Sequence, residues 1–232
     1  MRRGIMATQS VSFSTFKFNE EYTVYDIVEV LNQVNSVDEK FIINDYNDTL
    51  IDGLYVISIH LKEMKFNMIT NSYENEDIVK NIVTNFIIDI EREIIEIWGN
   101  RMNSQRILTK LALEFNNKVI IDNIKMDLSK IILNLKRCNF KIGKVKIEDV
   151  LLKDNIIASC MFDLTNHDTP YKVLEEYKSK ITQISATVND GLGTVLTIAI
   201  FSSGSILVYR NREEISEEIL NMIKEICIGG GI

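Results

Sequence analysis

The spacing of hydrophobic residues along this 232-residue chain changes several times, and each spacing predicts a different element. Residues 9–18 alternate apolar and polar side chains, which is the period of a strand with one buried face. Residues 20–34 follow the pattern of an amphipathic helix. Its apolar stripe consists of Val24, Ile27, Val28 and Leu31, at positions i, i+3, i+4 and i+7.

The remainder of the first half predicts a series of short elements. Strands are predicted at 40–46, 53–62 and 63–70, and a short helix at 74–86. Residues 86–100 contain two apolar stretches around a charged turn, which indicates a hairpin. A second helix is predicted at 104–115, with Ile107, Leu108 and Leu111 on one face.

The second half predicts a similar series. A strand at 117–125 leads to a helix at 127–138, for which Asp127 is a suitable N-cap. The apolar stripe of this helix, formed by Leu128, Ile131, Ile132 and Leu135, repeats the spacing of the first helix. The remaining predictions are strands at 140–150, 155–164 and 182–190, a helix at 170–181 with Pro170 in its first turn, a hairpin at 194–210, and a last helix from near Glu213.

The two halves share the order strand, helix, strand, strand, variable insert, hairpin, helix. A shift of the first half by 112 residues superposes the hairpin–helix segments: Ile94 then meets Ile206, Ser104 meets Ser216, and Leu111 meets Ile223. Coincidence in an Ile-rich chain is the alternative to duplication. The prediction is an α+β fold of two repeats, residues 1–116 and 117–232, each an antiparallel sheet with helices on one face.

Charge differs between these halves. Residues 1–116 carry 11 Lys and Arg against 18 Asp and Glu, whereas residues 117–232 carry 15 of each, and the net charge is −7. An acidic protein is a poor nonspecific nucleic-acid binder, because such binding depends on phosphate neutralisation. We expect the acidic first half to contact a basic protein partner.

Three widely spaced cysteines, Cys138, Cys160 and Cys227, indicate a reducing compartment without disulfides. The sequence shows no signal-peptide pattern and no apolar run approaching the roughly 20 residues of a membrane helix. We therefore expect a soluble intracellular protein without a membrane partner, located in a nucleus, a nucleoid or a viral replication site.

Candidate chemistry is sparse. His60 and His167 have no partner at metal-ligand spacing, and the chain contains neither HxxxH nor CxxC. The loop 189–194 (NDGLGT) lacks the rest of a dinucleotide fingerprint and is predicted to be a hairpin turn. The SSGS sequence at 202–205 lacks a nucleophile elbow, and Gly204 is explained by a turn that requires positive φ. The sequence predicts no catalytic residues, no cofactor and no metal.

The segment TIAIFSSGSILVYRNREE (197–214) resembles a signature stretch of the TATA-binding proteins. Its matching residues are Thr197, Ile200, Phe201, Ser202, Ser203, Gly204 and Val208. The resemblance covers about 18 residues, while the duplicated order of elements extends it over most of the chain. The divergence is similar to that of TATA-binding-protein-like factors of large DNA viruses.

This resemblance implies a saddle whose concave sheet lies in a DNA minor groove, with Phe201 as a wedge between base steps. Strand alternation adds Ala199 to the face of Phe201, and Leu207 and Tyr209 join it across the turn. Arg210 follows directly. Shape readout by such a surface favours deformable, AT-rich steps.

Two lysines of the strand 140–150, Lys144 and Lys146, share one face and are the candidate phosphate contacts. The alternative is a solvated outer face. The chain also departs from the family pattern: Ser205 replaces a lysine, and Tyr209–Arg210 replaces Thr-Gly. In the first repeat, Asp89 occupies the position of Phe201, so we do not expect that half to bind DNA in the same way.

The sequence therefore predicts a noncatalytic, DNA-binding or transcription-associated factor. The alternative is a protein–protein adaptor that keeps the scaffold and has lost DNA binding. An enzyme is the third possibility, for which the sequence offers no catalytic constellation.

Overall fold

The structure is a computed structural model that describes residues 8–151, 156–167, 169–189 and 195–229. The predicted turn at 190–194 lies outside the described residues. The chain divides into two compact units, an N-terminal unit of residues 15–121 and a C-terminal unit of residues 1–14 and 122–232. Residues 8–14 thus belong to the same unit as most of the second half of the chain.

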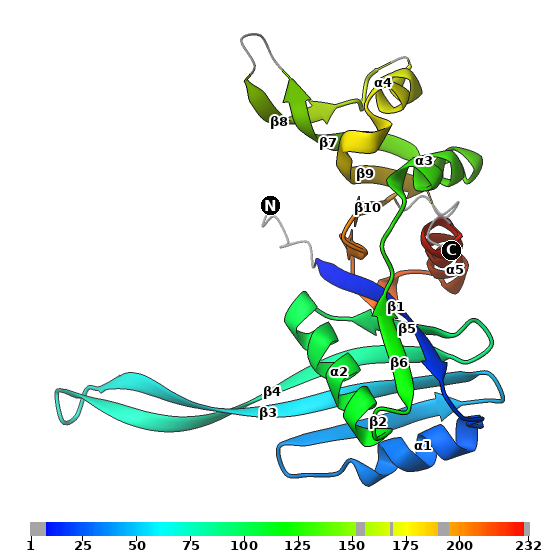
Figure 1. The fold of residues 1–232 in the computed structure, drawn as a ribbon. Helices are drawn as coiled ribbons and strands as arrows, with labels where there is room; N and C mark the ends of the chain where they lie inside the picture. The colour runs from blue at the N-terminus through cyan, green and yellow to red at the C-terminus, as the bar shows by residue number, and fades with distance from the viewer. Residues whose placement is uncertain (1–7, 152–155, 168, 190–194, 230–232) are drawn as a thin grey trace. The chain divides into compact units, whose positions relative to one another are not determined.

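The N-terminal unit is an antiparallel sheet packed against two helices (Figure 1). Its sheet order is β2-β3-β4-β5-β1, and the last residues of β1 form its final strand. The elements are β1 (Gln9–Phe18), α1 (Val24–Gln33), β2 (Glu39–Tyr46), β3 (Leu50–Asn67), β4 (Ser72–Asp89), β5 (Ile94–Trp98), α2 (Arg101–Glu114) and β6 (Val119–Asn123).

The helix α1 begins where the sequence provides a capping box. The Thr23 hydroxyl accepts a hydrogen bond from the Asp26 amide at 3.3 Å, and the Asp26 carboxylate accepts one from the Thr23 amide at 2.8 Å. The predicted stripe of α1 is buried in one cluster with Ile107, Leu108 and Leu111 of α2 and with apolar residues of the sheet. Both helices therefore pack on the same core.

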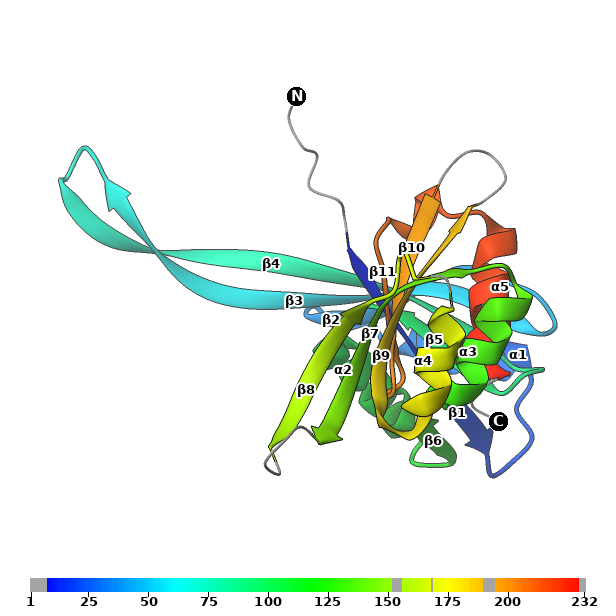
Figure 2. The same cartoon turned by 90° about the horizontal axis from the view of Figure 1, so that it is seen from above.

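The C-terminal unit has the sheet order β1-β11-β10-β9-β7-β8, to which β1 contributes its first residues. Helices α3, α4 and α5 lie along one face of this sheet (Figure 2). The elements are α3 (Leu128–Arg137), β7 (Lys141–Leu151), β8 (Ile157–Asp163), α4 (Pro170–Glu176), β9 (Ile181–Asn189), β10 (Val195–Phe201), β11 (Ser205–Val208) and α5 (Glu217–Ile228), with short 3-10 turns at Lys178–Lys180 and Arg212–Glu214.

The apolar stripe predicted for 127–138 is buried in α3, and Asp127 caps this helix by accepting from the amides of Ser129 and Lys130. The predicted pairs Ile107–Ile219, Leu108–Leu220 and Leu111–Ile223 of the 112-residue shift are buried positions in α2 and α5. Their N-caps differ, however, because α2 begins after Asn100 and α5 after Ser216.

The prediction of a helix at residues 74–86 is wrong. These residues belong to β4, which pairs with β3 along 18 residues of each strand. Ile78, Ile82 and Phe86 recur every four residues, and this spacing fits one face of a strand as well as one face of a helix. The neighbouring β-branched residues favour the strand. Residues 63–67 continue β3, so the predicted insert from residue 63 is the outer part of a long hairpin.

Several helix boundaries also differ from the predictions; the first helix, for example, begins at Val24 rather than at Glu20. The helix predicted at 170–181 ends at Glu176, because residues 178–180 form a 3-10 turn and β9 starts at Ile181. The last helix begins at Glu217 rather than near Glu213, since the Ser216 hydroxyl accepts the Ile219 amide and defines the first turn. Among the described residues, no helix combines the length and hydrophobicity needed to span a bilayer.

Helix α3 offers a matched test of its packing. Leu135 is fully buried, whereas Leu133 on the same helix is 58% exposed. We expect Leu135→Ala to lower the free energy of unfolding by about 2–5 kcal/mol, because it removes buried methyl groups and leaves a cavity. Leu133→Ala should change it by about 0.5 kcal/mol or less. Chemical denaturation measures both, and equal effects would contradict the assigned faces of α3.

Candidate nucleic-acid interface

The C-terminal unit presents one face of its sheet to the helices and the other away from them. On β10 and β11 the helix-side residues Ile198, Ile200, Ile206 and Val208 are each 0% exposed. The intervening residues Thr197, Phe201, Leu207 and Tyr209 are half-buried. We call the second side of this sheet the open face. Phe201 therefore does not lie beneath a helix.

The turn between β10 and β11 requires glycine. Gly204 has φ of 95°, and a Cβ at this position would lie 2.0 Å from the carbonyl oxygen of Ile124. Its amide donates to the Phe201 carbonyl at 3.0 Å, which closes the turn. The predicted role of Gly204 is confirmed, and the turn fixes Phe201 at the end of its strand.

The four predicted apolar contacts are brought onto the open face, although they do not contribute equally. Ala199 lies directly opposite Leu207 but is only 1% exposed, so it offers almost no surface. The Tyr209 amide donates to the Thr197 carbonyl at 3.1 Å, which continues the β10–β11 ladder and keeps Tyr209 in phase with Leu207. Arg210 is half-buried in the bend that follows.

The lysines of β7 reach the same face across β9. Val145 and Ile147 are buried on the helix side, so Lys144 and Lys146 point to the open face. Lys146 lies opposite Gln183 of β9, and Gln183 lies opposite Phe201 of β10. The structure thus places Lys146, Gln183 and Phe201 in one row across three strands.

Both lysines have acidic neighbours on this face. The Lys146 ammonium lies 2.6 Å from a carboxylate oxygen of Glu148. Lys144 lies opposite Asp163 of β8. The pKa of Asp163 is lowered by hydrogen bonds from the Thr165 side chain and amide and, to a smaller extent, by the charge of Lys144. Much of the positive charge expected from the sequence is therefore balanced locally.

Sequence reasoning missed the polar centre of the open face. Gln183, Ser185 and Thr187 of β9 are half-buried and lie opposite Phe201, Ala199 and Thr197. The sequence could have indicated these three residues through the alternation of TQISATVN in β9. The intervening residues Ile184, Ala186 and Val188 are buried. This face therefore combines apolar side chains with neutral hydrogen-bonding groups.

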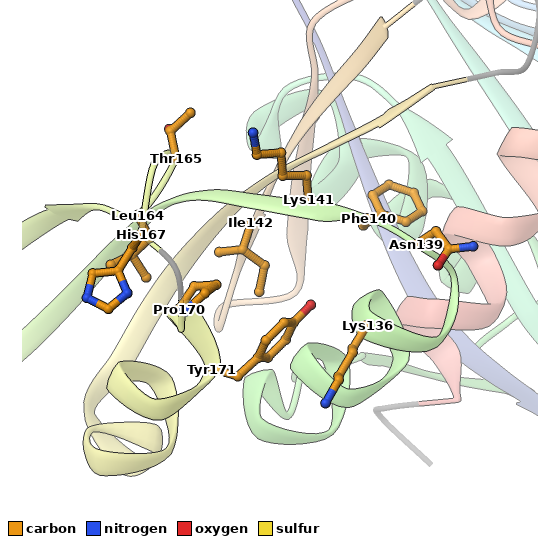
Figure 3. A pocket seen from close by; sticks show the side chains of 10 residues that line it. All are labelled: Lys136, Asn139, Phe140, Lys141, Ile142, Leu164, Thr165, His167, Pro170 and Tyr171. Carbon is orange, nitrogen blue, oxygen red and sulfur yellow. The ribbon is translucent and has the colours of Figure 1, made fainter.

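A pocket of this unit lies elsewhere, where α3, α4 and the start of β7 meet (Figure 3). Its volume is about 340 Å³. The Lys136 ammonium lies 5.1 Å from the centre of the Tyr171 ring, and burial raises the pKa of Tyr171. Lys141 and His167 extend away from this pair, so the basic groups do not converge on one point.

The two histidines have structural partners. A ring nitrogen of His167 accepts the Thr169 amide at 3.1 Å, in the turn that leads into α4. His60 lies 2.9 Å from the carboxylate of Asp38. The described residues bring together no group of three or more His, Cys, Asp or Glu side chains suited to a metal ion.

In comparisons with known proteins, no family model matches the chain, and no curated protein matches it.

The carboxyl group of Asp163 tests the charge arrangement beside Lys144. The Thr165 hydroxyl and the Lys144 charge both stabilise the ionised form, so removal of either should raise the pKa of Asp163. We expect Thr165→Ala to raise it more than Lys144→Gln does. An NMR titration of the Asp163 carboxyl carbon measures both shifts, and an unchanged pKa in both variants would contradict the geometry.

Proposed function

We propose that this protein is a noncatalytic DNA-binding, transcription-associated factor that resembles a TATA-binding protein. In this proposal the open face of the C-terminal unit lies in the minor groove of an AT-rich duplex. The observation that carries the proposal is the row of half-buried residues on β10 and β11, with Phe201 at its end and the lysines of β7 on the same face across β9.

The order of elements supports the resemblance beyond the local sequence match. The chain runs strand, helix, strands, helix from β1 to α2, and again from β6 to α5, with α4 as an addition. Helices α1 and α3 are each ten residues long and bury the same four-residue pattern. A duplicated sheet with helices on one side leaves a second side available for a ligand.

Minor-groove binding suits the chemistry of this face. Apolar side chains fit against sugars and the edges of A·T pairs, and an aromatic side chain at a strand end is placed to wedge between base steps. Hydroxyl and amide groups of β9 match the acceptors of the groove floor. Because Lys144 and Lys146 have acidic neighbours, we expect moderate affinity and discrimination by DNA deformability rather than by charge.

A protein–protein adaptor is the second candidate, favoured by the N-terminal unit. Ile88 and Phe86 of β4 face its core, so Asp89 lies on the side away from the helices. Asp52 lies on that side as well, opposite Ile87 of β4. Carboxylates on this surface would repel a phosphate backbone and suit a basic protein partner.

Substitution of Phe201 tests the DNA proposal. Loss of a buried phenyl contact costs about 1.5–3 kcal/mol, so Phe201→Ala should weaken binding to an AT-rich duplex by about tenfold or more. Fluorescence anisotropy measures the affinity. Leu133→Ala, which removes an exposed apolar side chain from α3, is the matched control and should bind like the unchanged protein. Equal binding by both variants would exclude Phe201 as a contact.

Salt dependence tests the role of Lys144 separately. If this ammonium contacts a phosphate, Lys144→Gln should reduce the slope of log affinity against log salt concentration by about 1. Lys172→Gln, at an exposed position of α4 on the helix side, should leave the slope unchanged. An adaptor without DNA binding predicts instead no DNA complex at physiological salt and retention of a basic protein partner by the full chain.

A further inference from the structure

The outer part of the β3–β4 hairpin extends beyond its neighbours in the N-terminal unit (Figure 1). The strand β2 pairs with β3 only as far as Ile57, and β5 pairs with β4 only from Asn85. Residues 58–84 therefore form a two-stranded ribbon, which we call the arm. Its strands span about 30–40 Å at 3.3 Å per residue.

The arm exposes apolar side chains on both of its faces. Leu61 is 47% exposed on the face that continues the helix side of the sheet. Phe66 and Tyr73 contact each other near the tip on the opposite face, and Tyr73 is 69% exposed. An isolated two-stranded ribbon is at best marginally stable in water, whereas additional strands stabilise it. The arm thus has both apolar surface and backbone groups to offer a further strand.

The two outer edges of the arm are not equivalent. Near the base of the β3 edge, the Ser58 amide donates to the Asp38 carbonyl at 2.8 Å, and His60 pairs with the Asp38 carboxylate. Within the described residues, no strand pairs with the outer edge of β4 from residue 72 to residue 84. A long unpaired edge is a template for strand addition.

We propose that the outer edge of β4 pairs antiparallel with β4 of a second copy of this chain, in the register that places Ile78 opposite Ile78. Opposite residues share a face in an antiparallel ladder, so this register also places Glu76 opposite Lys80 of the second copy, twice by symmetry. It places Asn75 opposite Asn81. The arrangement brings no two like charges directly opposite each other.

Neighbouring registers that preserve the faces are less favourable. The register centred on Asp77 places Asp77 opposite Asp77, and the register centred on Lys80 places Lys80 opposite Lys80. The register centred on Val79 brings no like charges together, but it places Glu76 opposite Ile82 and Lys80 opposite Ile78, so both Glu76–Lys80 pairs are lost. Like charges directly opposite each other destabilise a sheet. Of the registers centred on Asp77, Ile78, Val79 and Lys80, only the one centred on Ile78 both avoids like-charge pairs and places Glu opposite Lys.

Apolar side chains on both faces gain partners in this register. On one face, Leu61 and Ile78 of one copy lie beside Ile78 and Leu61 of the other, a row of four aliphatic side chains across four strands. On the opposite face, Val56 and Val83 of one copy meet Tyr73 and Phe66 of the other. The exposed tip of each arm is therefore covered by the base of its partner.

Disulfide cross-linking tests the two-fold axis in the full chain. Ile78→Cys should form a covalent dimer under mild oxidation, because the two sulfurs face each other across the new ladder. Asn75→Cys lies on the same strand about 20 Å from its own counterpart and should form no covalent dimer. The unchanged protein, with its half-buried Cys138 and Cys160, gives the background. Equal cross-linking at positions 75 and 78 would overturn the proposed register.

A charge exchange between two variants tests the pairing without a covalent bond. In Glu76→Lys alone or Lys80→Glu alone, each homodimer gains two like-charge pairs, and its dissociation constant should rise by about tenfold or more. A mixture of the two variants restores both opposite-charge pairs and should form a heterodimer of nearly the original affinity. Analytical ultracentrifugation measures all three, with circular dichroism as the check of folding.

Two results would overturn the proposal. One is an unchanged protein that stays monomeric at high micromolar concentration. The other is a mixture that associates no better than its separate components, which would show that any dimer forms through another surface.

Discussion

One-sided burial of the strands is the constraint on which both units depend. In β10 and β11 the residues at every second position are fully buried against the helix side, and those between them, apart from Ala199, are half-buried. A strand has only two faces, so helices that cover one face leave the other to a different partner. The same amphipathic stripes of α1 and α3 that stabilise the core therefore determine which residues are available on the opposite surface.

Beyond the part of the N-terminal sheet that the helices cover, the same constraint leaves apolar side chains exposed. The β3–β4 ribbon continues past the last pairings with β2 and β5, and its apolar residues continue with it. Selection against aggregation usually removes long apolar edges or covers them. A ribbon that retains Leu61, Phe66, Tyr73 and Val83 in exposed positions is best explained by a surface that completes it.

Local patterns were sufficient to predict much of the fold. The stripes of α1 and α3 specify helices because their spacing fits only the 3.6-residue period, and the Gly204 turn specifies its hairpin through a conformation that other residues rarely adopt. Residues 74–86 were misassigned because a four-residue spacing fits both periods. Only the pairing with β3, which lies far away along the sequence, decides the matter in favour of the strand.

The candidate site shows the same boundary between local and nonlocal information. Alternation along β10 assigns Phe201 to the same face as Ala199, and alternation along β7 assigns Lys144 to the same face as Lys146, both without knowledge of the structure. Sequence alone does not place Gln183 between Phe201 and Lys146, because that row depends on the register of three strands. The local pairing of Lys146 with Glu148, and the position of Asp163 opposite Lys144, became visible only in the folded sheet.

Lys144 and Lys146 have acidic neighbours, which limits the affinity of one open face for DNA. This limit connects the DNA-binding proposal with the dimer proposal. The number of phosphate contacts governs binding to DNA at physiological salt, and one open face has few unopposed cations to contribute. Association of two chains through their arms would place two such faces in one assembly. The second face would then bind at the effective concentration set by the first, which raises avidity without any additional contact. Because the arm and the open face belong to different units, each can be disabled by substitution while the other stays intact. A weak face and an unpaired edge are therefore consistent with each other: under the two proposals, dimerisation would supply the affinity that the charge of a single face does not.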